Sequence, residues 1–124
     1  MSVLVDTSVW VDYFRSGNNS EELDFLIDKN LVVINDLILA ELIPFLKIRK
    51  QQKIIQLLYQ IEKFDLYINW EQIIKYQYKC LKNGLNGIGI PDLIIAQNAN
   101  QNNSKIYSLD KHFVLISNIL DIKI

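Results

Sequence analysis

The stretch that decides the fold is SVLVDTSVWVDYF, residues 2–14. An apolar run rich in valine stops at Asp6, two small hydroxyl residues follow, and a second apolar run begins at once. Residues 2–5 are typical of a buried strand and residues 8–14 of a short helix. Asp6 therefore stands between two buried segments, with no Gly or Pro to form a loop. One interpretation of Asp6 is a simple helix cap, and the other is a functional carboxylate.

Length and composition indicate one globular domain that spans residues 1–124. Half of the residues are hydrophobic, 22% are charged, and the formal net charge is -1, so no global positive field predicts binding to nucleic acid or to a membrane surface. The single cysteine, Cys80, excludes an internal disulfide and is expected to be a buried thiol. We find no secretory signal pattern at the start and no apolar run of the ~18 residues that a membrane helix needs, so we expect a cytoplasmic protein.

Strands and helices are expected to alternate along the rest of the chain. Further strands are predicted at residues 31–34, 64–68, 105–109 and 119–124, and helices at residues 21–29, 37–48, 51–63, 70–81 and 92–103. Asn19 and Glu22 suggest a capping box for the first of these helices, and Pro44 should kink or interrupt the second. The strands lack polar alternation, which favours an α/β domain with a mostly parallel sheet covered by helices on both faces.

Four acidic residues fall where such a sheet forms its site, outside the carboxyl ends of the strands. Asp6 ends the first strand, Asp110 follows a late strand, and Asp92 opens a helix. Glu41 lies in a helix that is otherwise almost entirely apolar, and it is expected to be buried. A salt bridge with Arg15, Arg49 or a lysine would neutralise Glu41, and a metal ion is the alternative.

The face of the helix that carries Asp92 also carries Ala96 and Ala99, and we expect these small side chains to leave room for a bulky group beside the carboxylate. Carboxylates that converge on one crevice repel one another, and a divalent cation removes that repulsion. Mg²⁺ takes oxygen ligands, and one or two such ions can activate a water in phosphodiester hydrolysis. The four acids together therefore predict a site for Mg²⁺ (or Mn²⁺).

At this point the sequence resembles a PIN-domain ribonuclease, and specifically a VapC-type toxin of a bacterial toxin–antitoxin pair. The resemblance covers essentially the whole chain and rests on three segments: VLVDTSVWVDYF, LILAELIPFL, and IPDLIIAQNANQNNSKIYSLDKHF. The family has Asp-Thr/Ser-Ser after the first strand, a Glu in a following helix, an Asp opening a later helix, and Thr/Ser-x-Asp after the next strand. Asp6, Glu41, Asp92 and Asp110 match these acids in order.

The resemblance implies a PIN-like three-layer α/β/α fold and a Mg²⁺- or Mn²⁺-dependent endoribonuclease, usually dimeric and inhibited by a cognate antitoxin. Asp6 and Asp92 are then the foremost metal ligands, while Glu41 and Asp110 complete the set or orient the attacking water. Ser8 and Ser108 match the family's hydroxyl residues and are expected to hold the carboxylates by hydrogen bonds.

RNA binding by a chain of this charge needs a local basic strip. Only KIRKQQK, residues 47–53, concentrates cations, and we expect RNA phosphates to contact Lys47, Arg49, Lys50 and Lys53. A solvated surface is the other interpretation of that run, and an RNA path along Arg15 and Lys111 is an alternative. His112 is expected to be a surface residue of a short turn more readily than a substrate contact.

Three rival functions are compatible with a domain of this size. A phosphatase of the haloacid-dehalogenase type needs a second Asp two residues after the first, and Ser8 stands there instead. A response-regulator receiver needs paired acids at the first strand, which this chain lacks. A catalytically silent PIN-like binding module stays open, because the presence of four acids does not demonstrate turnover.

Overall fold

The protein is described by a computed structural model that covers residues 2–15, 17 and 20–124, so the predicted cap at Asn19 lies outside the described residues. Its elements, in chain order, are β1 (Val3–Val5), α1 (Thr7–Phe14), α2 (Ser20–Asp28), β2 (Val32–Ile34), α3 (Asp36–Ile48), α4 (Gln52–Gln60), β3 (Glu62–Lys63), α5 (Trp70–Lys82), α6 (Ile90–Gln101), β4 (Lys105–Tyr107) and α7 (Lys111–Leu120). None of these helices is long and apolar enough to cross a lipid bilayer.

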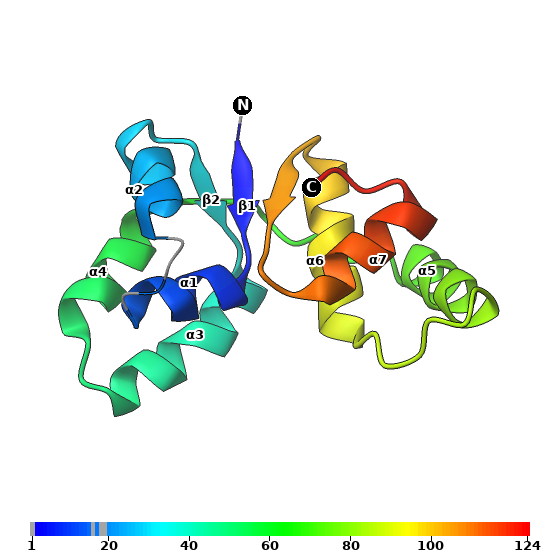
Figure 1. Cartoon of the computed structure of the whole chain (residues 1–124), viewed down its shortest axis with the longest axis horizontal. Helices are drawn as coiled ribbons and strands as arrows, with labels where there is room; N and C mark the ends of the chain where they lie inside the picture. The colour runs from blue at the N-terminus through cyan, green and yellow to red at the C-terminus, as the bar shows by residue number, and fades with distance from the viewer. Residues whose placement is uncertain (1, 16, 18–19) are drawn as a thin grey trace.

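The four strands form one parallel sheet in the order β3-β2-β1-β4. Strand β1 lies inside the sheet, where Leu4 pairs with Val33 of β2 and with Ile106 of β4. Helices α1 to α4 lie on one side of the strands in Figure 1 and α5 to α7 on the other. This arrangement confirms the predicted three-layer α/β/α fold with its parallel sheet, and it brings the carboxyl ends of β1, β2 and β4 to one edge.

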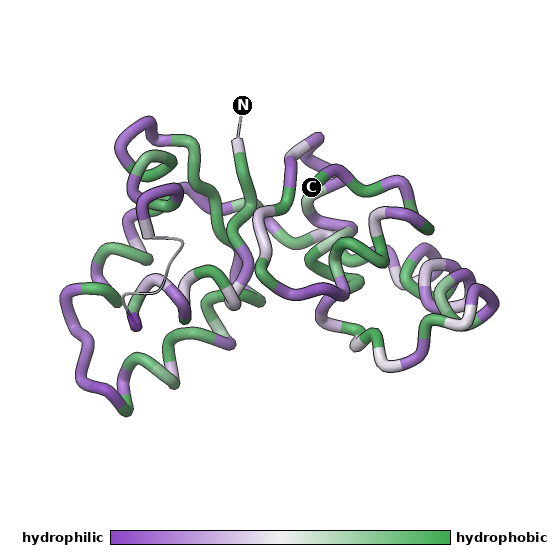
Figure 2. Tube along the Cα trace, viewed as in Figure 1, coloured by the Kyte–Doolittle hydropathy of each residue, from purple (hydrophilic) through white to green (hydrophobic). Residues whose placement is uncertain are grey.

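The central strands are buried on both faces, which explains why they lack polar alternation. Leu4, Val5 and Ile34 have no solvent-exposed surface, and Figure 2 shows β1 and β2 as hydrophobic segments through the middle of the molecule. Trp10 of α1 is also fully buried, and its indole N–H donates to the carbonyl oxygen of Val5 over 3.2 Å. The stretch at residues 2–14 therefore supplies both a central strand and the helix that packs on it.

Helix α6 is buried along most of its length between the sheet and the helices α5 and α7. Ala96 and Ala99 are fully buried, so the expectation that they leave room beside Asp92 is wrong. Their small side chains instead allow the helix to pack closely. The polar residues of the helix are satisfied there: Gln97 bonds the backbone of Asn69, and Asn98 bonds the carbonyl of Asp65.

Two of the predicted strands, at residues 64–68 and 119–124, are wrong. The strand predicted at residues 64–68 is instead the two-residue β3 at Glu62–Lys63, followed by irregular chain. Residues 111–120, most of which were not assigned to any element, form α7, in which Phe113, Ile116 and Leu120 repeat at helical spacing and are buried. The segment predicted as a last strand, 119–124, contributes the end of α7 and one backbone bond, from Ile106 to Lys123.

Helix α3 continues through Pro44, so the predicted interruption does not occur. Proline removes the N–H that would bond the carbonyl of residue 40. Ala40 and Pro44 both lie on the exposed face of the helix, where water can solvate that carbonyl. The helix therefore continues to Ile48.

A buried polar chain fixes α3 to the rest of the fold. The side chain of Asn35 accepts a bond from the Ile38 N–H as the helix cap and donates to Asn98 of α6 over 2.9 Å. Asn35 is fully buried, so truncating it removes a cap and also leaves polar groups of Ile38 and Asn98 without partners. Asn69 caps α5 in the same way, but at an exposed position.

We predict that Asn35→Ala lowers the free energy of unfolding by about 2–3 kcal/mol, while Asn69→Ala lowers it by about 1 kcal/mol or less. Urea unfolding of both variants measures the difference. Equal losses in the two variants would show that the bond from Asn35 to Asn98 contributes nothing beyond a cap.

Candidate active site

Asp6 is a buried carboxylate at the end of β1, with 6% of its surface exposed. It occupies the N-cap position of α1, but its side chain makes no capping bond, so the simple cap interpretation is wrong. Oδ2 of Asp6 instead accepts the hydroxyl of Ser8 over 3.0 Å and the hydroxyl of Ser108 over 2.9 Å. Burying a carboxylate is costly unless donors compensate for the lost water, and these two hydroxyl groups are such donors.

The two serines also connect the site to the chain that follows β4. Ser8 accepts the backbone N–H of Leu109 over 3.0 Å, and Ser108 accepts that of Asp110 over the same distance. Each hydroxyl thus receives one backbone hydrogen and gives its own hydrogen to Asp6. Residues 100 positions apart in the sequence are held around one carboxylate oxygen, because β1 and β4 are neighbours in the sheet.

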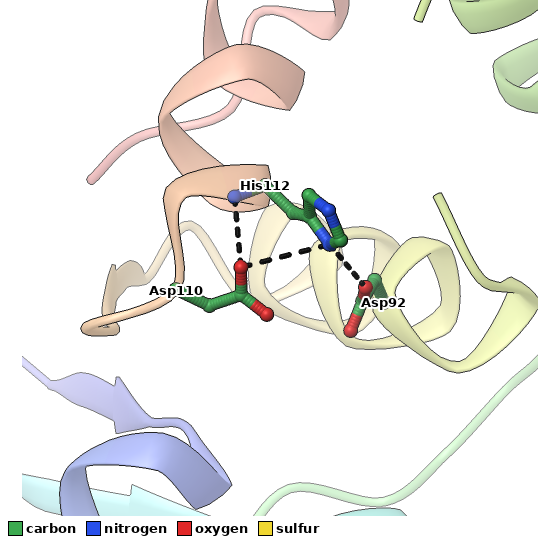
Figure 3. Close-up of side chains that lie close together, drawn as sticks. All are labelled: Asp92, Asp110 and His112. Carbon is green, nitrogen blue, oxygen red and sulfur yellow. Dashed lines mark hydrogen bonds and ion pairs between the residues drawn. The ribbon is translucent and has the colours of Figure 1, made fainter. Parts of the chain in front are cut away.

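Asp92, Asp110 and His112 form a second group (Figure 3). Asp92 lies in the first turn of α6, and Asp110 caps α7 by accepting the N–H of His112 over 2.9 Å. Nδ1 of His112 lies 3.6 Å from Oδ2 of Asp92 and 3.6 Å from Oδ1 of Asp110. The imidazole therefore stands between two carboxylates that come from different helices.

Glu41 is exposed on α3, so the expectation of a buried carboxylate is wrong. The buried side of the helix consists of residues such as Ile38, Leu42 and Leu46, and Glu41 lies at the border of that side. Its Oε1 accepts the hydroxyl of Thr7 over 2.8 Å. That bond fixes Glu41 to the start of α1, one residue after Asp6.

The four acids lie close enough together to act on one another electrostatically. Burial raises the pKa of Asp92 above its ordinary value, and the charges of Asp110, Asp6 and Glu41 raise it further, while His112 acts in the opposite direction. The carboxylates that the sequence separates by up to 104 positions thus share one field. The four carboxylates repel one another when all of them are charged.

The donor set fits a divalent cation. One ligand atom each from Asp92, Asp110 and His112 lies within 4.8 Å of the others; Asp6 and Glu41 are not members of this group, but their charges act on Asp92. Carboxylate oxygens are the ligands that Mg²⁺ and Mn²⁺ take, and a cation relieves the repulsion that raises the pKa of Asp92. These residues therefore suit a cation by both chemistry and charge.

Two residues of the site had no role in the sequence analysis. Thr7 belongs to the first motif, but only its contact with Glu41 reveals what it holds. His112 was expected in a surface turn, because α7 was not recognised. One pattern in the sequence could have revealed this helix: apolar residues follow Asp110 at helical spacing, at positions 113, 116 and 120. Such a pattern is typical of a helix capped by Asp110, and it would have placed His112 in the first turn.

The four cations of the expected basic strip lie at the end of α3, in the turn after it and at the start of α4, and all four are exposed. Lys47 lies on the side of α3 that carries Asp36, about 120° around the helix axis from Glu41. Arg49 lies on the Glu41 side and caps the C-terminal end of α3, and Lys50 follows in a turn with a φ of 56°. Lys53 belongs to α4. Of Lys47 and Arg49, Arg49 is therefore the nearer to the side of α3 that carries Glu41.

Comparisons with known proteins concern the family and the fold of the chain. The family model described as PIN domain matches residues 3–118. No curated protein matches the sequence closely enough to count as a relative.

Several solved structures share the fold. The chain is similar to VapBC2 from Rickettsia felis, bound to a DNA fragment from their promoter, with a TM-score of 0.77, 21% identity, and coverage of 99% of this chain and 96% of that chain. It is similar to VapBC-1 from nontypeable Haemophilus influenzae with a TM-score of 0.72, 23% identity and the same coverage. FitAcB from Neisseria gonorrhoeae aligns with a TM-score of 0.68 and 21% identity over 94% of each chain.

We predict that Asp92→Asn raises the melting temperature of the metal-free protein by a few degrees at neutral pH. A raised pKa means that the folded chain binds a proton at Asp92 more readily than the unfolded chain does, so this group's contribution to stability is lost as the pH rises through the folded pKa. The neutral isostere removes that loss. The gain should shrink as the pH is lowered and vanish below about 3, where Asp92 is protonated in both states.

Thermal unfolding in EDTA measures the effect, with Asp65→Asn as the control, because Asp65 is exposed and is not among the charges that act on Asp92. A lower melting temperature for Asp92→Asn at neutral pH would mean that the carboxylate is stabilised in the fold, contrary to the electrostatic argument.

Proposed function

Since the chain belongs to the PIN domain family, we propose that it is a metal-dependent endoribonuclease and acts as the toxin of a toxin–antitoxin pair in the cytoplasm. The observation that carries the proposal is the approach of Asp92, Asp110 and His112, whose ligand atoms lie within 4.8 Å of one another, at a place where the charges of Asp6 and Glu41 also act on Asp92. Four carboxylates in one field are costly to a fold unless they hold a cation. A cation held at this place could support hydrolysis of the phosphodiester bonds of a nucleic acid.

The acids have distinct tasks in this proposal. Asp6 and Asp92 hold Mg²⁺ or Mn²⁺, and Glu41 and Asp110 complete the set or orient the attacking water. A divalent cation held there supplies charge to activate water and to stabilise the leaving oxygen of a phosphodiester. Ser8 and Ser108 keep Oδ2 of Asp6 in a fixed orientation, which leaves its other oxygen to the cation.

Thr7 and His112 act as positioning residues in the same proposal. Thr7 donates to Glu41 and holds it toward the start of α1. Nδ1 of His112 lies 3.6 Å from an oxygen of Asp92 and 3.6 Å from an oxygen of Asp110, so the imidazole fixes where these two carboxylates lie. Together they keep flexible carboxylates at positions that a water and a phosphodiester can reach.

Two protein partners belong to this proposal. The Rickettsia felis and Haemophilus influenzae structures are named as VapBC complexes, which supports a cognate antitoxin for this chain. A homodimer is the other partner that the family resemblance implies. A catalytically silent PIN-like module is the alternative function, and a nuclease assay separates it from the enzyme.

We predict that Asp6→Asn abolishes RNA cleavage while the protein stays folded. Asn keeps the shape of the side chain and an oxygen that accepts the serine hydroxyls, but it removes the charge that holds the cation. Cleavage of single-stranded RNA in millimolar Mg²⁺ or Mn²⁺ measures the loss, with Asp65→Asn as the matched charge removal. Wild-type rates in Asp6→Asn would refute the metal role of this carboxylate.

We also predict that Mg²⁺ or Mn²⁺ stabilises the wild-type fold. A ligand that binds only the native state adds about 2.7 kcal/mol at a hundredfold excess over its Kd, which corresponds to a melting temperature several degrees higher. Asp6→Asn and Asp92→Asn should each lose most of that increase. An unchanged melting temperature of the wild type between EDTA and millimolar Mn²⁺ would count against a preformed metal site.

A further inference from the structure

A second polar cluster lies at the far ends of α1 and α3 from the acids. Arg15 and Arg49 are the C-cap residues of these helices, and both stand beside the ring of Phe45. The guanidinium carbon of Arg49 lies 4.5 Å from the ring centroid and that of Arg15 lies 5.9 Å from it. Both arginines are exposed and Phe45 is half-buried, so the ring is a fixed support for two mobile cationic groups.

Arg15 and Arg49 bring two positive charges to one ring. Among the ion pairs between described residues, none includes Arg15 or Arg49. Two guanidinium groups at one ring repel each other, and an anion between them would remove the repulsion. The planar fork of arginine matches phosphate oxygens in pairs, so phosphate is the anion that such a cluster suits.

The cluster is also aligned with the acids. Glu41, Phe45 and Arg49 are spaced four residues apart and follow one side of α3. Thr7 and Arg15 stand at the two ends of α1. Thr7 contacts Glu41 at one end of the helix pair, and Arg15 contacts Phe45 at the other. Figure 1 shows α1 and α3 side by side, both leading away from the strand ends.

The distance from Glu41 to Arg49 along α3 suits a short single strand of nucleic acid. Glu41 and Arg49 are eight positions apart, which is about 12 Å along the helix axis. A single strand of a few nucleotides can span that length. A phosphate at the arginines and a scissile phosphate at the carboxylates can therefore belong to the same strand.

We infer that Arg15 and Arg49, held by Phe45, form a phosphate clamp that guides single-stranded RNA along α1 and α3 to the carboxylates. This inference rests on the proposed nuclease function and adds the substrate's path to it. Contacts to phosphate carry no sequence information, so the clamp contributes affinity and direction and leaves the choice of cleavage site to other contacts. Lys47 and Lys53 lie outside this path, although they belong to the same basic stretch of sequence.

The test compares two double variants that remove the same charge. Arg15→Gln with Arg49→Gln removes the clamp, and Lys47→Gln with Lys53→Gln is the matched control. Binding of a fluorescent oligouridylate is measured by anisotropy in Ca²⁺ over a range of salt concentrations. The clamp variant should bind about tenfold or more weakly at low salt, and its salt slope should fall by about 1.4, for two phosphate contacts of about 0.7 each. The control should stay within about twofold of wild type.

Phe45→Leu keeps an apolar side chain and removes the ring that supports the arginines. It should weaken RNA binding in the same direction while both charges are retained, which an effect of net charge alone would not produce. Melting temperatures of all variants establish that each one is folded.

A small phosphodiester separates this inference from the nuclease proposal. Bis(p-nitrophenyl) phosphate is too short to reach the arginines, so the clamp variant should hydrolyse it at the wild-type rate while its kcat/KM on RNA falls. If the wild type cleaves neither substrate, the nuclease proposal fails, and the clamp is judged by RNA binding alone. Wild-type RNA affinity in the clamp variant, or an equal loss in the lysine control, overturns the inference; the former result would leave the cluster to a protein partner.

Discussion

The buried carboxylate of Asp6 is the constraint on which the rest of the site depends. It sits at the end of an inner strand with 6% of its surface exposed, where water cannot solvate it fully. The hydroxyls of Ser8 and Ser108 replace that water, and both are fixed in turn by backbone N–H groups after β4. The charge can remain buried only while β1 and β4 stay paired. The pairing of β1 with β4 also brings Asp110 toward Asp6. The acids therefore come together only when the sheet is formed.

The fold then adds charge where it is least favourable for stability. Asp92 enters from a helix on the opposite side of the sheet from the helix that carries Glu41, and each added carboxylate raises the pKa of Asp92. A domain selected for stability alone would place a neutral residue at such a position. Local elements here follow ordinary rules of burial and capping, and the departure from those rules is confined to the strand ends. That contrast is characteristic of a functional site.

Much of the fold could be predicted from the sequence, because apolar runs and helical spacing depend on neighbouring residues alone. The parallel sheet and most helix bounds follow from such patterns. Glu41 was predicted to be buried because its neighbours are apolar, but a helix on a sheet buries only one side, and sequence alone does not say which border residue faces water. His112 was missed with α7, whose short apolar spacing resembles a loop and strand. The contact of Thr7 with Glu41 depends on how two helices pack, which no local pattern encodes.

Positive and negative charges are separated along α1 and α3, although the molecule is nearly neutral overall. A formal net charge of -1 produces no uniform field that could attract RNA. Along α1 and α3, however, the carboxylates stand at the ends nearest the sheet and the arginines at the ends farthest from it. A polyanion is repelled by bare carboxylates and attracted by the arginines, so it approaches the far ends first. A cation at the carboxylates would reverse the repulsion there, and the bound metal would then decide whether a strand already held at the arginines can enter the site.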